Sequence, residues 1–230
     1  MDAGLYIAAS GMLAQQVRED QLANDLSNAS TPGYKSDASV QSDFGALLLS
    51  NTATGQQIGS INTGVKLGAP VTNLTPESLY STNQPLDFGI AGEGFFSVRT
   101  AQGVRYTRDG QFQENAQGLL VDGQGDPVLS QNGATITVSA QGTVPASSLG
   151  VFNLTNVSKQ GDNLYTGTLA GRGTGTVKQG ELENSAVDPV MTMVNMISSL
   201  QTYQAGENAI QAIDSTMQES ASSVGSLAGG

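Results

Sequence analysis

The stretch Leu22–Lys35, which reads LANDLSNASTPGYK, ends a helix and sets the organisation of the rest of the chain. Its apolar residues recur every three positions, which indicates one face of a helix: Ala23, Leu26 and Ala29. Pro32 cannot continue a helix, and it also biases Thr31 towards extended backbone. We therefore expect a helix over residues 5–29 that gives way to a turn before Lys35.

The composition argues against an enzyme. The chain of 230 residues contains no Cys and no His. Absence of cysteine excludes disulfides, iron–sulfur clusters and cysteine–zinc sites, and absence of histidine removes the commonest general base and metal ligand. We therefore expect no catalytic residue, no cofactor and no metal site.

The charge balance restricts the partners. The net charge is −11, and residues 179–230 contain six acidic residues without any Lys or Arg. An acidic chain without a basic stripe argues against nucleic acid and against an anionic membrane surface. No apolar run approaches the roughly 18 residues of a membrane span. Leu5–Ala14 lacks a basic flank, so we expect it to be mature sequence rather than a signal peptide.

The middle of the chain has the pattern of an all-β region. From Val65 to Glu181, short apolar runs alternate with turns at spacings near ten residues. Three of these turns carry strong hairpin signals, at Asp109-Gly110, Asp122-Gly123 and Asn132-Gly133. The pattern predicts an irregular antiparallel sheet or a small barrel. Residues 36–64, rich in Ser, Asn, Thr, Gly and Gln, predict a loop or extended arm with one anchoring patch at Ala46–Leu49.

A second helix is predicted after Asp188-Pro189, because Asp is a good N-cap and Pro suits the first helical position. One row of apolar residues recurs every seven positions: Met196, Tyr203, Ile210, Met217 and Val224. This spacing favours a seam that packs on another helix rather than on a sheet. An ordinary amphipathic helix lying on its own sheet is the alternative.

These patterns predict an α+β fold in which N- and C-terminal helices pair as a coiled-coil-like inner domain, with an irregular, mainly antiparallel β domain between them in the chain. The expected parts are residues 1–35, a helix and turn that join residues 183–230, then the arm 36–64 and the β domain 65–182. The side chains expected to mediate subunit assembly lie on the two helices: Leu5, Met12, Leu22, Leu26, Met193, Met196, Leu200, Tyr203, Ile210, Ile213 and Met217.

Four blocks of the sequence resemble the flagellar rod and hook proteins. The first is the motif at the end of the first helix, with matches at Asn24, Asn28, Thr31, Pro32, Gly33, Tyr34 and Lys35 and departures at Asp25 and Ser27. The others are similar to family runs at Ile90–Val98, at Tyr106–Phe112 and at Leu182–Asp188, followed by Val194–Ile197 and Tyr203 in the last helix. Ala186 departs where the family has Asn.

The resemblance implies a structural subunit of the flagellar rod, located in the basal body. It implies terminal helices that form the inner tube around the export channel, and a β region that forms an outer layer. Its implied partners are further copies of itself, neighbouring rod and hook proteins, and the flagellar type III export apparatus. The chain length favours rod over hook. Distal rod proteins usually carry a longer segment after the Tyr-Lys motif than residues 36–64 provide, but Leu182–Ser185 and Tyr203–Asp214 look more like the distal type. A distal rod protein is therefore favoured, and a proximal one comes next. A hook or hook-associated subunit and a secreted β-rich adhesin or binding module are the alternatives.

Other chemistry has weak signals in this sequence. Asp122 and Asp126 lie in a Gly-rich turn, where Asp side chains usually hydrogen-bond the turn backbone. The two carboxylates are too few for a typical calcium site. Glu181 with Glu183 precedes a helix and is interpreted as ordinary solvated charge. The glycines of residues 171–175 lack the strand-to-helix context of a phosphate loop, so we expect a hairpin there.

Overall fold

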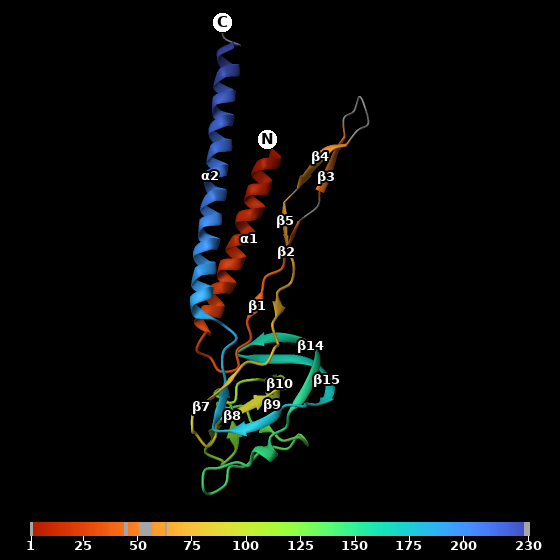
Figure 1. Cartoon of the computed structure of the whole chain (residues 1–230), viewed down its shortest axis with the longest axis vertical. Coiled ribbons are helices and arrows are strands. Elements are labelled where there is room, and N and C mark those ends of the chain that lie inside the picture. The colour runs from red at the N-terminus through yellow and green to blue at the C-terminus, as the bar shows by residue number, and fades with distance from the viewer. Residues whose placement is uncertain (1, 44–45, 51–56, 63, 228–230) are drawn as a thin grey trace. The chain divides into compact units, whose positions relative to one another are not determined.

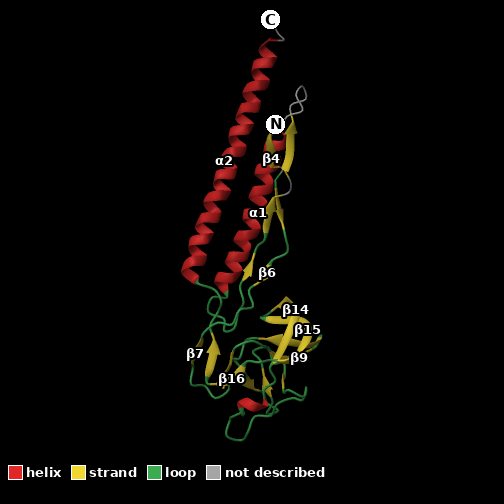
Figure 2. Cartoon of the chain, turned by 45° about the vertical axis from the view of Figure 1, so that its right-hand side comes forward, coloured by secondary structure: helices red, strands yellow, loops and turns green. Residues whose placement is uncertain are grey.

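The computed structural model describes residues 2–43, 46–50, 57–62 and 64–227 (Figures 1 and 2). The chain forms two compact units, each built from segments that are distant in sequence. The helical unit comprises residues 1–26, 37–71 and 189–230. The β unit comprises residues 27–36 and 72–188. The turn motif is therefore part of the β unit, although the sequence placed residues 1–35 with the helices.

The helical unit contains two long antiparallel helices, α1 (Asp2–Ser27) and α2 (Pro189–Leu227). Their antiparallel direction follows from their contacts, which run from Gly4 beside Ile213 to Met12 beside Gly206. Further along, the Ser199 hydroxyl donates hydrogen bonds to the Gln15 carbonyl oxygen (3.3 Å) and side-chain oxygen (3.0 Å). In the described part of the chain, no helix combines the length and apolar character needed to cross a membrane.

The inward side of α2 carries two rows with a seven-residue repeat. One is the predicted row, of which Met196, Tyr203, Ile210 and Met217 are partly buried. The other is offset by three or four residues and is mostly small or polar: Thr192, Ser199, Gly206 and Ile213. The seam therefore contains fewer large apolar side chains than a coiled coil of Leu and Ile. Its small residues allow the two helices to approach each other closely.

The inward side of α1 differs from the predicted stripe. Ala14 is its most buried apolar residue, whereas Ala23 is exposed. Because α1 starts next to Ile213, the turns of α2 after Thr216 extend beyond it (Figure 1). α2 has 39 residues and α1 has 26, so α2 is longer by roughly 20 Å at 1.5 Å per residue.

Strands form in the arm, residues 36–64, where the sequence suggested a loop or extended segment. They pair with each other or with strands in residues 65–72, which the sequence assigned to the β domain. β1 (Asp37–Ala38) pairs with β6 (Val71–Thr72), β2 (Gln41–Asp43) with β5 (Val65–Leu67), and β3 (Ala46–Ser50) with β4 (Gln57–Asn62). Leu47 lies opposite Ile61 in the last pair. The Ser10 hydroxyl accepts a hydrogen bond from the Val65 amide at 3.3 Å, which links α1 to the arm. The side chains of the predicted anchoring patch lie outside the described residues.

The β unit is built on a five-stranded antiparallel sheet, which confirms the predicted α+β class. The strand order is β13 (Val128–Leu129), β9 (Phe96–Thr100), β10 (Gly103–Thr107), β15 (Leu164–Arg172) and β14 (Phe152–Gly161). Three strand pairs lie beside it: β8 (Phe88–Ala91) with β16 (Thr176–Gln179), β7 (Leu79–Ser81) with β17 (Glu181–Glu183), and β11 (Gln113–Glu114) with β12 (Leu120–Val121). A 3₁₀ turn, η1, spans Ala146–Ser148.

The core of the β unit is a cluster of rings and aliphatic side chains. Its centre is Phe112, whose ring meets Phe96 edge-on at 5.3 Å and Phe88 at 6.3 Å between centroids. Aliphatic residues complete it: Ile90, Val98, Leu120, Val128, Ile136, Val144, Leu149 and Val151. The blocks of the sequence that resemble the rod and hook proteins therefore supply much of this core.

Candidate functional site

The motif at the end of α1 is docked into the β unit by backbone hydrogen bonds. The Gly33 amide donates to the Glu183 carbonyl at 2.9 Å, and the Ala186 amide donates to the Tyr34 carbonyl at 2.9 Å. The Ser185 hydroxyl donates to the Asn28 carbonyl at 3.0 Å. The segment that follows α1 and the segment that precedes α2 are thus hydrogen-bonded to one another within the β unit.

Gly33 is required at its position in this turn. Its φ is +64°, a conformation that glycine adopts readily. A Cβ at this position would lie 2.3 Å from the Arg108 carbonyl oxygen, so the turn approaches the backbone after β10 too closely for any side chain.

Lys35, Arg108 and Glu183 form a buried ionic triad. The Lys35 Nζ lies 2.6 Å from Glu183 Oε1, and an Arg108 terminal nitrogen lies 2.9 Å from Glu183 Oε2. All three side chains are almost completely removed from solvent. Lys35 also donates to the Thr75 carbonyl at 2.6 Å, and Arg108 donates to the Gly92 carbonyl at 2.8 Å. One carboxylate therefore connects the N-terminal motif, the β10 end and the C-terminal strand β17.

The electrostatics of the triad depend on this geometry. Burial lowers the pKa of Lys35, while the hydrogen bond and charge of Glu183 act in the opposite direction. Glu183 Oε1 also accepts a hydrogen bond from the Glu77 amide at 2.8 Å. Because two cations share one carboxylate, loss of Glu183 would leave both of them buried without their counterion.

Lys159 and Asn163, from β14 and the turn after it, hold the rest of the motif. The Lys159 ammonium lies 3.9 Å from the centre of the Tyr34 ring and donates to the Lys35 carbonyl at 2.8 Å. The Asn163 amide donates to the Pro32 carbonyl at 3.0 Å. Family-motif residues therefore act in this structure as a docking element for the β unit.

Glu183 and Arg108 were not recognised as a pair from the sequence. The interpretation of Glu183 as solvated charge was wrong, because the residue is 1% exposed. Glu181 is a solvated charge, as predicted, and its Oε2 lies 3.7 Å from Nζ of the accessible Lys178. The available signal was that Lys35, Arg108 and Glu183 each lie inside a family-like block, in a chain with only 13% charged residues.

The structure places the predicted assembly residues in two groups. Nine of them are partly buried: Leu5, Met12, Leu22, Leu26, Met196, Tyr203, Ile210, Ile213 and Met217. Met193 and Leu200 are exposed and lie on the other side of α2. Asn24, the first residue of the motif, lies on α1 in the helical unit, whereas Asn28–Lys35 lie in the β unit.

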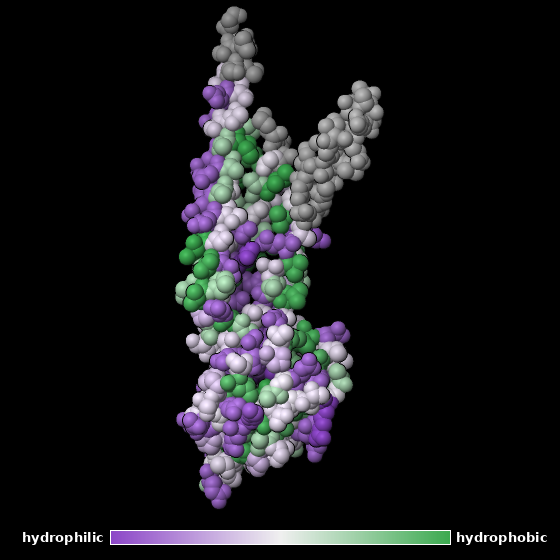
Figure 3. Space-filling model, viewed as in Figure 1, coloured by the Kyte–Doolittle hydropathy of each residue, from purple (hydrophilic) through white to green (hydrophobic). Residues whose placement is uncertain are grey.

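An apolar stripe covers the outward face at the start of α2. Its members are spaced by one helical turn or less and are Met193, Val194, Ile197 and Leu200, with exposed fractions of 50%, 55%, 56% and 39%. Figure 3 shows hydrophobic side chains gathered over these first turns. Contiguous exposed apolar surface of this kind marks an interaction surface rather than solvated surface.

The weaker chemical signals are explained by local hydrogen bonding. Asp122 Oδ1 accepts from the Gln124 amide at 3.0 Å and from the Asp126 amide at 2.9 Å, as a turn-capping Asp does. The Gly173 and Gly175 amides donate to the carbonyls of Val151 and Glu93, so they are not arranged as a phosphate loop. No group of three potential metal-ligating residues occurs among the described positions.

A chain whose helices pair, whose β unit anchors both helix connections and whose α2 exposes an apolar face has the organisation of a structural assembly protein. Comparison with known sequences identifies the family of assembly proteins to which it belongs. Residues 5–35 match the flagella basal body rod protein family, residues 89–161 the flagellar hook protein FlgE/F/G D1 domain, and residues 178–223 the flagellar basal body rod FlgEFG protein C-terminal region. The chain belongs to the flagellar basal-body rod protein family.

Similar proteins align with almost the whole chain. The flagellar basal-body rod protein FlgG of Buchnera aphidicola (subspecies Schizaphis graminum) is 30% identical, covering 94% of this chain and 97% of its own. FlgF of Caulobacter vibrioides is 31% identical, with 97% of both chains covered. The hook-basal body complex protein FlhO of Bacillus subtilis is 31% identical, with 97% and 99% covered. The predicted family is thus confirmed, and the protein is a structural rod subunit of the flagellar basal body that assembles with other rod and hook components.

Proposed function

We propose that this chain polymerises, with further copies of itself and with neighbouring rod proteins, into the hollow helical shaft of the flagellum. It reaches the growing end through the flagellar type III export apparatus. The helical unit forms the inner tube and the β unit the outer layer. This single structural role leaves no part for catalysis.

The observation that carries the proposal is the apolar stripe on α2. The seam of α2 faces α1, so the stripe on its other side is available to a second helix. Full burial of one such side chain contributes roughly 1.5–3 kcal/mol. Repetition of one non-self-complementary contact of this kind produces an open helical polymer rather than a closed ring.

The end of α2 supplies a second contact of the same kind. Its turns after Thr216 continue past the start of α1, and the predicted heptad row continues there with Met217. A heptad row that extends beyond its partner helix can pair with the helix of a neighbouring subunit. The stripe and the extended end together provide contacts on two sides of the helix pair.

The proposed position is the distal part of the rod. Support comes from the resemblance of Leu182–Ser185 and of Tyr203–Asp214 to the distal type. Electron microscopy of basal bodies from a strain that lacks this gene tests the proposal. Truncated rods without hooks are expected, with a stub that retains its proximal part. Complete hook-basal bodies would contradict the role, and a stub shorter than the proximal rod would contradict the distal position.

A point substitution tests the stripe itself. Ile197→Asp places a charge in the stripe without touching the seam, so we expect a folded protein that is absent from purified rods. Thr202→Asp is the matched control, because Thr202 is exposed on another side of the same helix. Normal assembly of the Ile197 variant, or equal loss in both variants, would refute the stripe as the contact.

A further inference from the structure

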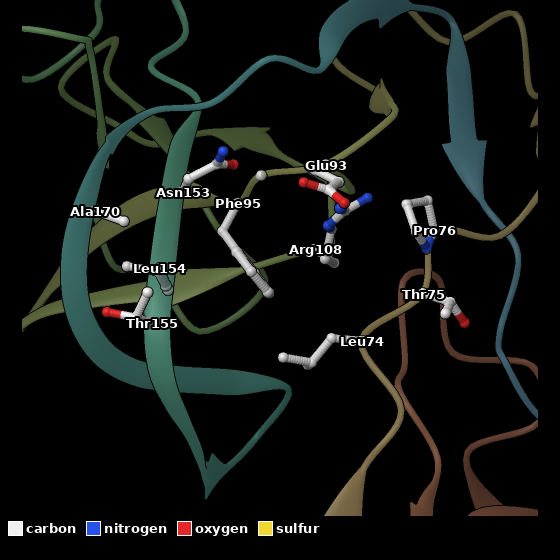
Figure 4. Close-up of a pocket in the computed structure, with 11 residues that line it drawn as sticks. Leu74, Thr75, Pro76, Glu93, Phe95, Arg108, Asn153, Leu154, Thr155 and Ala170 are labelled. Atoms are coloured by element: carbon white, nitrogen blue, oxygen red, sulfur yellow. The ribbon is translucent and has the colours of Figure 1, made fainter.

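A pocket in the β unit has a buried hydrogen-bond donor in its wall. The pocket has a volume of about 500 Å³ and lies between the edge strand β14 and the segment before β7 (Figure 4). Its apolar lining comes from Leu74, Phe95, Leu154 and Ala170. Arg108 also lines it, and the Nε–H of this buried side chain has no hydrogen-bond partner among the described residues. A buried unsatisfied donor costs roughly 1–3 kcal/mol, so an acceptor supplied by a ligand would be stabilising.

The charges around the pocket define what it can accept. The guanidinium of Arg108 already shares the Glu183 carboxylate, and the exposed Glu93 stands at the rim. Figure 4 draws Glu93 and Arg108 among the residues that line the pocket. A second carboxylate would be repelled by Glu93, whereas a neutral carbonyl oxygen would not. The fitting ligand is therefore an uncharged segment with an apolar side chain, flanked by positive charge that complements Glu93.

The chain itself carries such a segment. The tip of the β9–β10 hairpin, residues 101–104, comprises the two-residue turn and the first two residues of β10; it is exposed and contains no charged residue. Val104 is a large apolar residue with 45% of its surface exposed, and Arg99 and Arg105 flank the turn. An edge strand such as β14 also offers backbone groups to an extended segment.

We propose that this pocket binds the β9–β10 turn of a second copy of the chain. Val104 of the second copy fills the apolar part, a carbonyl oxygen of its turn accepts from Arg108 Nε–H, and Arg105 faces Glu93. The pocket and the turn are different surfaces of one unit, so the contact repeats from copy to copy without closing. The inference rests on the proposed function, because it describes how copies contact one another in the rod.

Cysteine pairing in cells tests the contact, because the natural chain contains no cysteine. The variant with Thr155→Cys and Val104→Cys is expected to give a ladder of disulfide-linked multimers of this chain on non-reducing gels of purified rods. The control pairs Val104→Cys with Thr143→Cys. Thr143 is also an exposed threonine with a side-chain hydrogen bond, but it does not line this pocket. The control is expected to give no ladder.

Charge reversal provides a second readout. Glu93→Arg and Arg105→Glu should each reduce rod assembly, and the double variant should restore it, while Glu114→Arg, at an exposed acid that does not line the pocket, should have no effect. Rods that contain the protein but show neither a ladder nor rescue would overturn the pocket while leaving the proposed function intact. Cross-links to a different rod protein would overturn the choice of a second copy. Absence of the unmodified chain from rods would instead refute the proposed function.

Discussion

At the scale of single residues, Glu183 is the shared counterion of two buried cations in the β unit. Glu183→Gln should lower the free energy of unfolding by about 3–5 kcal/mol, because two buried cations lose their shared counterion. Urea unfolding of the β unit, followed by near-ultraviolet circular dichroism, measures the change. The control Glu181→Gln, in an accessible pair, should change it by about 0.5 kcal/mol or less. Equal effects of the two substitutions would show that the triad is not stabilising.

Gly33 gives a second test at this scale. Gly33→Ala should destabilise the β unit by clearly more than the roughly 1–2 kcal/mol of a left-handed conformation, because the new Cβ would collide with the Arg108 carbonyl. Gly142→Ala is the matched control, since Gly142 has φ +70° and open space around it. The difference between the two free energies of unfolding measures the close approach. No difference would mean that the turn can move away from Arg108.

Asp109 should make the stability of the β unit depend on pH. Burial raises its pKa to about 6, despite a hydrogen bond from the Gln111 amide, and Asp122 and Asp87 add repulsion. The folded state therefore holds this proton more tightly than the unfolded state, and stability declines as pH rises from about 4 through 6. Asp109→Asn should be more stable than the natural protein at pH 8, by up to about 3 kcal/mol, and equal to it below pH 4.

The matched control for that substitution is Asp162→Asn, which changes an exposed turn residue and should leave stability almost unchanged at both pH values. Unfolding of all three proteins is compared at pH 4 and pH 8. A gain from Asp109→Asn that is the same at both pH values would rule out titration of this carboxyl as its cause.

At the scale of elements, substitution by Ala should affect stability differently at two glycines of the helix pair. Gly11→Ala should raise the stability of the helical unit by about 1 kcal/mol, because Ala favours helix and the new Cβ meets nothing within 4 Å. Gly206→Ala should give no such gain, because its Cβ would lie 2.9 Å from the Met12 side chain. Thermal unfolding followed at 222 nm measures both. Equal gains would show that the helices are not closely packed at Gly206.

Periodic elements could be predicted from the sequence, and contacts distant in sequence could not. The seven-residue row from Met196 to Met217 indicated the seam of α2, and the Asp-Gly and Asn-Gly turns indicated the β region. The stripe of α1 was misjudged because its inward face is made of small and polar residues such as Ala14. The strands of the arm were missed because Ser, Gln and Gly dominate it and give no alternation.

The triad shows why the site was harder to predict than the fold. Nothing local distinguishes Glu183 from Glu181, two positions earlier on the same strand. The two side chains lie on the same face of β17, so strand alternation does not separate them. Their environments differ because only Glu183 meets Lys35 and Arg108, whereas Glu181 pairs with the accessible Lys178. The family motifs identified the positions, whereas their ionic role required the fold.

At the scale of the whole molecule, each unit should depend on both ends of the chain. A chain of residues 27–188 retains the motif turn and Glu183, so we expect its β unit to fold. A chain of residues 37–181 lacks Lys35 and Glu183 and exposes Arg108, so we expect it to remain unfolded or to aggregate. Dispersion of amide signals in nuclear magnetic resonance spectra distinguishes the two. A well-folded shorter chain would show that the triad is dispensable.

The separation of Lys35 from Glu183 in sequence has a consequence for the timing of folding. These residues are 148 positions apart, and α1 pairs with a helix that begins still later. Whether the N-terminus or the C-terminus is delivered first, the chain cannot form the triad or pair its helices until most of it has arrived. On the export route proposed above, the order of residues alone would keep the triad open and the helices unpaired while the chain is inside a narrow conduit.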